Sequence, residues 1–237
     1  MTGGDGLFSP QMPLQLEPRR YGRFDTFVAG PNGAAVQAVR ASVGEAGAMV
    51  FLHGAESSGK THLLNAACQA ARTNGLTAFY LGLRRLPMGG VDSLQGLEAM
   101  DLVCIDDLHR VAGDPAWEEG LFHFINRVRE RKGRLLVASA ERLSALPLGL
   151  PDLRSRLAWG LRVELQPLDD DDKLAVMHAH AAAVGIELPE DVARYLLRYG
   201  QRGVGSLVAA VERLQHAAFT AKRRITVPLA REVLGRQ

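Results

Sequence analysis

Apolar and polar positions along the chain alternate between two patterns from residue 48 onward. Short apolar runs bounded by turn residues predict buried strands, and amphipathic stretches between them predict helices over 61–73 and 118–131. Gly75 and Gly133 follow these helices, as C-caps do. The predicted strands are 49–52, 77–81, 102–105, 135–138 and 161–165. This order of elements predicts an α/β fold with a parallel sheet sandwiched by helices.

After Pro167 the strand pattern stops and the chain reads as helical. We expect helices over 171–184, 189–199 and 204–222, a last turn or two after Pro228, and a short strand-like link at 225–227. Residues 1–20 are rich in glycine and proline without any periodicity, which predicts a flexible tail. The domain prediction is therefore a tail at 1–20, an α/β base at 21–166 and a small C-terminal helical domain at 167–237.

The acidic run 169–172 fits the start of a helix, where negative charge meets the positive end of the helix dipole, better than it fits a metal site. His178 and His180 are two positions apart and face different sides of a helix, so they make a poor metal pair.

Composition excludes some broad classes of protein but does not identify the function. With 237 residues, 47% hydrophobic and 23% charged, the chain resembles an ordinary globular protein. It has no apolar run long enough for a membrane helix and no secretory signal, so we expect a cytoplasmic protein without membrane contact. Cys68 and Cys104 lie in apolar surroundings, which favours free thiols over a disulfide. A net charge of +2 neither requires nor excludes nucleic acid.

A phosphate-binding loop follows the first predicted strand. The segment 54–61, Gly-Ala-Glu-Ser-Ser-Gly-Lys-Thr, fits the pattern G-x-x-x-x-G-K-S/T at every fixed position and precedes a predicted helix. Glycines allow the backbone to aim successive N–H groups at phosphate oxygens, Lys60 adds a positive charge, and Thr61 offers a hydroxyl to Mg²⁺. The predicted nucleotide-binding residues of the loop are Gly54, Ser57, Ser58, Gly59, Lys60 and Thr61.

A second motif follows the third predicted strand. Asp106 and Asp107 come directly after the apolar run 102–105. At the carboxyl end of that strand, Asp106 would hold Mg²⁺ through water and Asp107 would orient an attacking water. Together with the loop, this pair indicates binding of ATP with Mg²⁺.

With both motifs in place, the chain resembles the initiator clade of AAA+ proteins, and most of all its Hda-type members, the DnaA-related regulatory inactivators of replication initiation. The segment 23–30 is similar to the stretch that this family places over adenine, which implies nucleotide contacts for Phe24, Phe27 and Val28. The segment 153–160 is similar to the family's arginine-finger box. The resemblance assigns the finger to Arg156, with the adjacent Arg154 as an open alternative. From Leu168 the chain resembles the family's helical lid.

The tail is similar to the short peptide with which Hda-type proteins dock on the sliding clamp, the β subunit of DNA polymerase III. The segment 11–16 has a proline that stiffens an extended peptide. Its first residue, a glutamine, can form hydrogen bonds through its amide, and its apolar side chains can fill a groove. The residues that carry this expectation are Gln11, Met12, Leu14 and Leu16.

Two positions depart from the DnaA pattern. Gly205 falls where the lid arginine would contact phosphates, and Arg202, about one turn upstream, is the candidate substitute. After the fourth strand, Ser139 is the only candidate for the polar sensor. Both departures predict weak intrinsic ATPase activity, so the resting chain would hold ADP or ATP mainly as a structural or switching ligand.

The resemblance implies a regulator that docks on the sliding clamp and stimulates hydrolysis of DnaA-bound ATP by a finger supplied in trans. The chain ends at Gln237 without the helix-turn-helix domain of DnaA, so we expect no sequence-specific DNA binding. Self-association into a homo-oligomer is left open. One alternative is a DnaC-like ATPase that loads a helicase on single-stranded DNA. Another is a DnaA-related protein that acts at other DNA sites through protein contacts.

Overall fold

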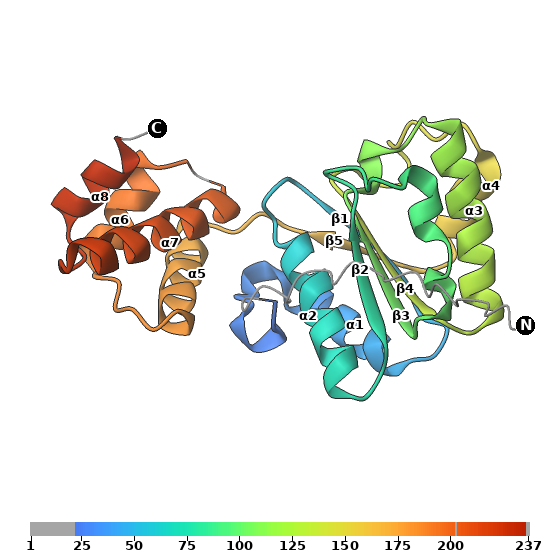
Figure 1. Cartoon of the computed structure of the whole chain (residues 1–237), viewed down its shortest axis with the longest axis horizontal. Coiled ribbons are helices and arrows are strands. Elements are labelled where there is room, and N and C mark those ends of the chain that lie inside the picture. The colour runs from blue at the N-terminus through green and yellow to red at the C-terminus, as the bar shows by residue number, and fades with distance from the viewer. Residues whose placement is uncertain (1–21, 202, 236–237) are drawn as a thin grey trace, which may run out of the picture.

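A five-stranded parallel sheet forms the centre of the protein, in the order β2-β3-β4-β1-β5 (Figure 1). The computed structural model describes residues 22–201 and 203–235. All predicted strands are confirmed, and no strand end differs from the expected one by more than two residues. The strands are β1 (Met49–Gly54), β2 (Ala78–Gly82), β3 (Leu102–Asp106), β4 (Arg134–Ser139) and β5 (Leu161–Leu165).

Helices cover both faces of the sheet because its strands are apolar on both sides. Helices α1 (Gly33–Gly44) and α2 (Lys60–Thr73) pack on one face, and α3 (Pro115–Glu130) with α4 (Pro151–Leu157) pack on the other. Alternate residues of β1 to β4 enter the two cores, as in β4, where Leu136 faces α2 and Leu135 faces α3. The edge strand β5 contributes Val163 and Leu165 to the core under α1 and α2 alone. The predicted sandwich architecture is therefore confirmed.

Two helices of the base were not predicted as such. In α1, Val36, Val39 and Val43 are buried at helical spacing, but the surrounding alanines and glycines hid the period. The short α4 overlaps the segment 153–160, which was interpreted only by its family resemblance. The third base helix begins at Pro115, three residues before the expected start, because Asp114 caps it by accepting hydrogen bonds from two backbone N–H groups.

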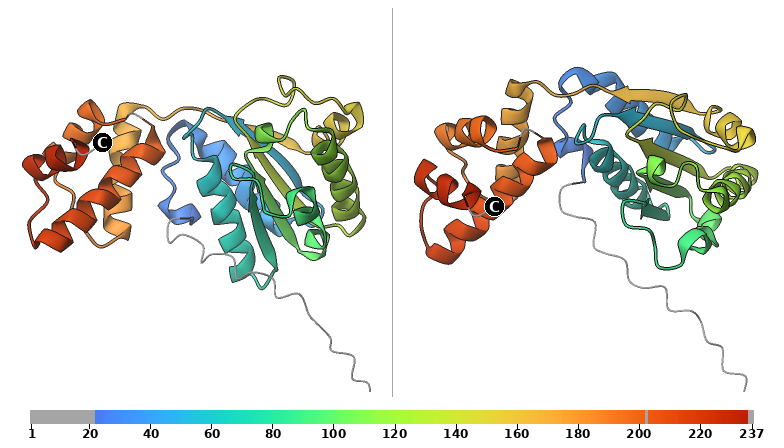
Figure 2. Two further views of the ribbon diagram at one scale, coloured as in Figure 1. Left: turned by 45° about the horizontal axis from the view of Figure 1, so that its top comes forward. Right: turned by 90° about the horizontal axis from the view of Figure 1, so that it is seen from above.

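The C-terminal domain is a helical bundle with a core of its own, set to one side of the sheet (Figures 1 and 2). Its helices are α5 (Asp170–Ala183), α6 (Glu190–Tyr199), α7 (Val204–Ala221) and α8 (Val227–Leu234). The expected strand-like link at 225–227 is wrong, since no strand forms there and Val227 already begins α8. Thr226 is extended but has no neighbouring strand with which to pair.

Polar groups in the bundle serve local structure. Asp169 caps α5 by accepting a 2.8 Å hydrogen bond from the Asp172 backbone N–H, so the acidic run starts a helix as expected. His178 contacts Glu190 at 2.8 Å, and His180 lies 3.6 Å from Glu212.

Within the described parts of the chain, no helix combines the length and apolar character needed to cross a membrane. Cys68 and Cys104 are buried free thiols, as the sequence predicted.

Candidate functional site

The loop between β1 and α2 adopts the strained backbone that its glycines predict. Gly54 has a φ of 157° and Gly59 a φ of 100°, and both fall in the region that side chains disfavour. A Cβ at Gly54 would lie 2.5 Å from the Leu165 carbonyl oxygen, and one at Gly59 would lie 2.8 Å from the Phe27 ring. Ser57 also has a positive φ, of 62°. The fixed glycines are thus required both by the turn and by close neighbours.

Lys60 is buried at the start of α2, with 6% of its surface exposed. Its ammonium Nζ donates 2.7 Å hydrogen bonds to the carbonyl oxygens of Gly54 and Ala55, so it lies inside the curl of the loop. Burial lowers the pKa of Lys60, and the nearby carboxylate of Asp106 opposes this shift. The Ser58 hydroxyl is also buried and has no hydrogen-bond partner among the described residues. The loop therefore concentrates polar groups that a phosphate can satisfy.

Asp106 ends β3 beside the loop, with 1% of its surface exposed. Its Oδ2 accepts hydrogen bonds from the Thr61 hydroxyl at 2.6 Å and from the Tyr80 hydroxyl at 2.8 Å. Its Oδ1 accepts from the Asp107 backbone N–H at 2.9 Å. The structure thus brings together the two residues predicted to hold Mg²⁺, and their oxygens suit a cation that prefers oxygen ligands.

Tyr80 is a member of this group that sequence reasoning missed. Burial, followed by the charge of Asp106, raises the pKa of Tyr80 well above its ordinary value, so the hydroxyl stays a donor. The signal available in the sequence was its place on the strand that pairs with β3, two residues before the strand's carboxyl end.

Asp107 and Ser139 flank this group. Asp107 has a φ of 60°, and its Oδ2 accepts a hydrogen bond from Arg84 at 3.3 Å. Ser139 is fully buried, and its hydroxyl accepts a hydrogen bond from the Glu141 backbone N–H at 3.1 Å. The Ser139 hydroxyl therefore shapes the turn after β4.

The segment 23–30, which is predicted to cover adenine, contacts the phosphate loop through Phe27. The Phe27 ring packs over Gly59 and meets the His62 ring edge-on at 5.3 Å. Phe24 lies instead under the Arg40 guanidinium, 4.8 Å from its carbon, and Val28 is half-buried.

The lid meets the phosphate loop at the start of α7. A Cβ at Gly203 would lie 3.2 Å from the Ser57 hydroxyl oxygen, and one at Gly205 would lie 3.7 Å from it. Position 205 therefore faces the loop, where its glycine presents no side chain. Arg202 and the tail residues Gln11, Met12, Leu14 and Leu16 lie outside the described residues.

The two arginines of α4, which are two residues apart, have different surroundings. Arg154 donates to the carbonyl oxygens of Leu143 at 2.6 Å and Leu146 at 2.8 Å, so its guanidinium is committed to the loop before α4. Arg156 points elsewhere, since two helical steps turn a side chain by about 200°. Its guanidinium carbon lies 3.9 Å from the centre of the Trp159 ring. The geometry favours Arg156 as the arginine that a partner can reach.

A buried carboxylate also fixes α4, and sequence reasoning missed it. Glu118 on α3 is 3% exposed and accepts backbone hydrogen bonds from Gly113 at 2.8 Å, Gly149 at 3.1 Å and Leu150 at 2.6 Å. Because Leu150 directly precedes α4, Glu118 ties that helix to α3. Arg154 and Glu118 together set the position of Arg156.

Arg156 lines an open hollow of about 480 Å³ on the side of the sheet that α3 and α4 cover. Asn126, Arg129, Glu130 and Trp159 line it as well. The phosphate loop leads into α2, which packs on the opposite face (Figure 1). Arg156 and the helix that follows the phosphate loop therefore lie on opposite faces of the sheet.

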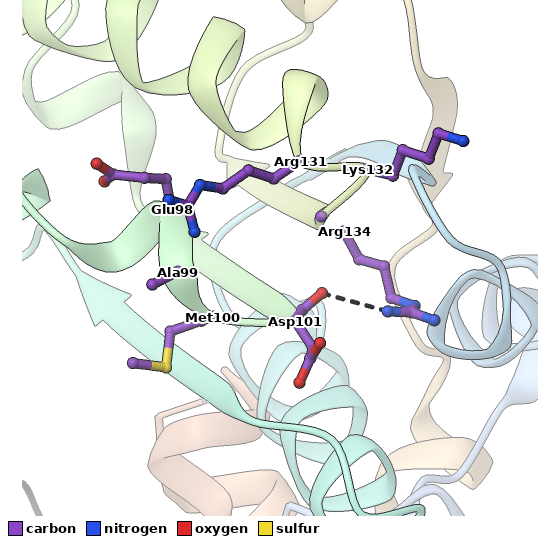
Figure 3. Close-up of a pocket in the computed structure, with 8 residues that line it drawn as sticks. Glu98, Ala99, Met100, Asp101, Arg131, Lys132 and Arg134 are labelled. Atoms are coloured by element: carbon purple, nitrogen blue, oxygen red, sulfur yellow. Dashed lines mark hydrogen bonds between the residues drawn. The ribbon is translucent and has the colours of Figure 1, made fainter.

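A second hollow, of about 280 Å³, lies at the amino ends of β3 and β4 (Figure 3). Arg131, Lys132 and Arg134 line it beside Glu98 and Asp101. The Asp101 carboxylate is occupied by Thr77, which donates to it from its backbone and hydroxyl at 2.8 Å each. This hollow is at the opposite end of the strands from the phosphate loop and takes no part in that site.

Comparison with known proteins identifies the family. Residues 18–164 match the family model of the bacterial DnaA ATPase domain, and residues 170–234 match that of the Hda lid domain. The chain belongs to the DnaA-related AAA+ proteins and has an Hda-type lid. It is thus a member of a family of replication initiation regulators.

Solved structures support the AAA+ fold. Domain III of DnaA from Thermotoga maritima is 22% identical, with a TM-score of 0.80 over 93% of this chain and 98% of that one. DnaA from Aquifex aeolicus bound to AMPPCP is 23% identical, with a TM-score of 0.68 over 85% and 67% of the two chains. The RuvB Holliday junction branch migration motor of Thermotoga maritima is 20% identical, with a TM-score of 0.67 over 92% and 73%.

Proposed function

We propose that this DnaA-related AAA+ protein holds an adenine nucleotide with Mg²⁺ and, docked on the sliding clamp, stimulates hydrolysis of DnaA-bound ATP with Arg156. The observation that carries the proposal is the position of Arg156. Arg156 is half-buried and lines a hollow on the face opposite α2, and the neighbouring Arg154 is committed to the loop before α4.

The residues of the phosphate loop fit a nucleotide. Lys60 is placed among the loop carbonyls, and the Ser58 hydroxyl is buried with no hydrogen-bond partner in 22–201 or 203–235. Gly54 and Gly59 leave room that a side chain would fill. Thr61 and Asp106 would hold Mg²⁺, which neutralises phosphate charge when bound. The described neighbour from Aquifex aeolicus carries AMPPCP, which supports the same ligand class here.

Weak intrinsic hydrolysis is part of the proposal. Gly205 is a lid position that faces the Ser57 hydroxyl, and it has no charge to place on a phosphate. Gly205→Arg should raise intrinsic ATP hydrolysis several-fold, because the new guanidinium would begin beside the loop. Phosphate release by the purified chain measures this, with Gly205→Ala as the matched control. An unchanged rate in Gly205→Arg would argue against a phosphate contact at this position.

In trans, Arg156 would place its guanidinium on the γ-phosphate of DnaA-bound ATP. A finger of this kind contributes roughly 10³ to 10⁵ in rate, or about 4 to 7 kcal/mol of barrier. A protein with no nucleophile of its own can thus control a partner. The DnaA family assignment and the Hda-type lid support DnaA as that partner.

Clamp docking would place the two proteins together. We assign it to Gln11, Met12, Leu14 and Leu16, whose pattern of amide and apolar side chains suits a groove. The test is DnaA–ATP hydrolysis with clamp loaded on DNA, with and without this chain. A rate increase that Gln11→Ala abolishes supports the proposal, provided that the variant still binds ADP. No stimulation by the intact chain would overturn it, and loading of a helicase on single-stranded DNA by this chain would favour the DnaC-like alternative.

A further inference from the structure

We propose that Trp159 is the positioning residue of the finger, and that its ring holds the Arg156 guanidinium between encounters with the partner. This inference rests on the proposed function of Arg156. It adds a residue outside the nucleotide site and predicts an optical signal for the state of the finger.

Two arginines lie over the ring of Trp159. The guanidinium carbons of Arg129 and Arg156 both lie 3.9 Å from the ring centre. At that height a planar guanidinium covers one face of the ring, so two of them require opposite faces. Arg129 comes from α3 and Arg156 from α4, and the indole therefore joins the two helices.

Arg156 has this stack in place of an ion pair among the described residues, although Glu130 lines the same hollow. Among the residues that the structure describes, no carboxylate oxygen lies within 4.0 Å of the guanidinium of Arg129 or Arg156. Arg127, two residues before Arg129 on α3, does form an ion pair with Glu98 at 3.2 Å. The Arg156 Nε is shielded from solvent and has no hydrogen-bond partner in the described chain. A cation held by an aromatic face keeps its hydrogen-bond donors for an anion.

The group that holds the Arg156 guanidinium within this chain determines how easily the guanidinium can move to a phosphate. A carboxylate would hold the guanidinium by bidentate, charge-assisted hydrogen bonds, which a phosphate would first have to displace. The indole holds it by a weaker interaction and still restricts its rotamers. Phe122, whose ring centre is 5.5 Å from the Arg156 guanidinium carbon, limits the side chain further. Release to a phosphate is therefore favourable, and the approach geometry is already set.

The first test separates positioning from partner affinity. Trp159→Ala should lower the rate of DnaA–ATP hydrolysis at saturating concentrations of this chain by about ten-fold, because the finger is misplaced. The half-saturating concentration should change little. Trp159→Phe keeps an aromatic face and should recover most of the rate. Full activity in Trp159→Ala, or loss through a raised half-saturating concentration alone, would overturn the inference.

The second test needs no partner. Trp159 is 41% exposed and the other tryptophan, Trp117, is 5% exposed, so Trp117→Phe leaves Trp159 as the sole reporter. Arg156→Ala should change its emission and increase its quenching by acrylamide, because one ring face is uncovered. If Trp117→Phe does not fold, the accessible fraction of acrylamide quenching in the intact chain reports the same residue. Unchanged quenching in Arg156→Ala would contradict the stack.

The two tests also distinguish failure of this inference from failure of the proposed function. A chain that shows the optical change but never stimulates DnaA has the stack without the function, and Trp159 then positions no finger. A chain that stimulates DnaA through Arg156 without the optical change has the function, and the role of Trp159 is refuted.

Discussion

The phosphate loop and the surface around Arg156 and Trp159, called the finger surface below, hold their cations in opposite ways. In the loop, Lys60 is 6% exposed and its ammonium is hydrogen-bonded to main-chain carbonyls. At the finger surface, Arg156 lies on an aromatic ring and faces an open hollow. The first arrangement suits a ligand that stays bound, and the second suits an anion that belongs to another molecule. Under the proposed function, the first arrangement would hold this chain's nucleotide and the second would act on a partner's.

The scaffolds behind the two cations differ as well. Strained backbone and close contacts shape the phosphate loop, where Gly59 lies under Phe27. Side chains that bind main-chain groups shape the finger surface, where Glu118 and Arg154 fix the segment before α4. Substitutions should therefore affect ligand binding in the first region and either catalysis in trans or folding in the second.

The largest effect is expected at the finger. Arg156→Ala should abolish most of the stimulation of DnaA–ATP hydrolysis, a loss of roughly 10³ or more if the finger works as in other nucleotide hydrolases. Single-turnover hydrolysis with clamp on DNA measures it, and ADP binding by the variant serves as the folding control. Stimulation equal to that of the unmodified chain would remove Arg156 from the mechanism.

In the phosphate loop, Lys60→Ala should weaken binding of ADP by about 100-fold, because one charge-assisted hydrogen bond to phosphate is lost. Calorimetric titration in the presence of Mg²⁺ measures this. Arg84→Ala is a matched control, since it removes a cation that pairs with Asp107 outside the loop. Similar losses in both variants would indicate a general charge effect, and tight binding by Lys60→Ala would break the assignment of the loop.

The adjacent arginines of α4 offer a comparison of stability. Arg154→Ala should lower the free energy of unfolding by about 3 kcal/mol, because carbonyl groups around Leu143 and Leu146 lose their charged donor. Arg156→Ala should lower it by no more than about 1 kcal/mol, the scale of an exposed cation–π contact. Urea denaturation of both variants gives the ranking. The reverse order would mean that Arg154, and not Arg156, is the free arginine.

The smallest effect concerns pH. Burial lowers the pKa of His53, His62 and His180 from 6.5. Because the unfolded chain then takes up protons more readily, stability is fully present above pH 6.5 and falls as the pH drops through the lowered values. The urea midpoint should decrease between about pH 7.5 and pH 5.5. Carboxyl groups with a lowered pKa, such as Asp101, titrate below this window. A higher midpoint at the acidic end would contradict the sign.

Sequence reasoning predicted the sheet and the phosphate loop because both depend on local patterns. Buried strands appear as continuous apolar runs, and the loop is specified by glycines whose conformations no other residue adopts easily. Helix α1 was missed because its buried valines lie among alanines and glycines, which carry little polarity contrast.

The contacts that individual side chains make could not be predicted in the same way. The sequence shows Arg154 and Arg156 as equivalent, and only their contacts with loop carbonyls and with Trp159 separate them. Glu118 is also indistinguishable from a surface acid until the loop 140–150 folds over it. Tertiary contacts between distant segments decide these roles.

Under the proposed function, this chain keeps its own nucleotide and promotes hydrolysis of its partner's. The most direct measurement loads DnaA with γ-labelled ATP and this chain with unlabelled ATP, then reverses the labels, and follows phosphate release on clamp-loaded DNA. Rapid release of label from DnaA, with slow release from this chain, is the predicted result. Rapid release from this chain's own site, with DnaA-bound ATP left intact, would contradict the account.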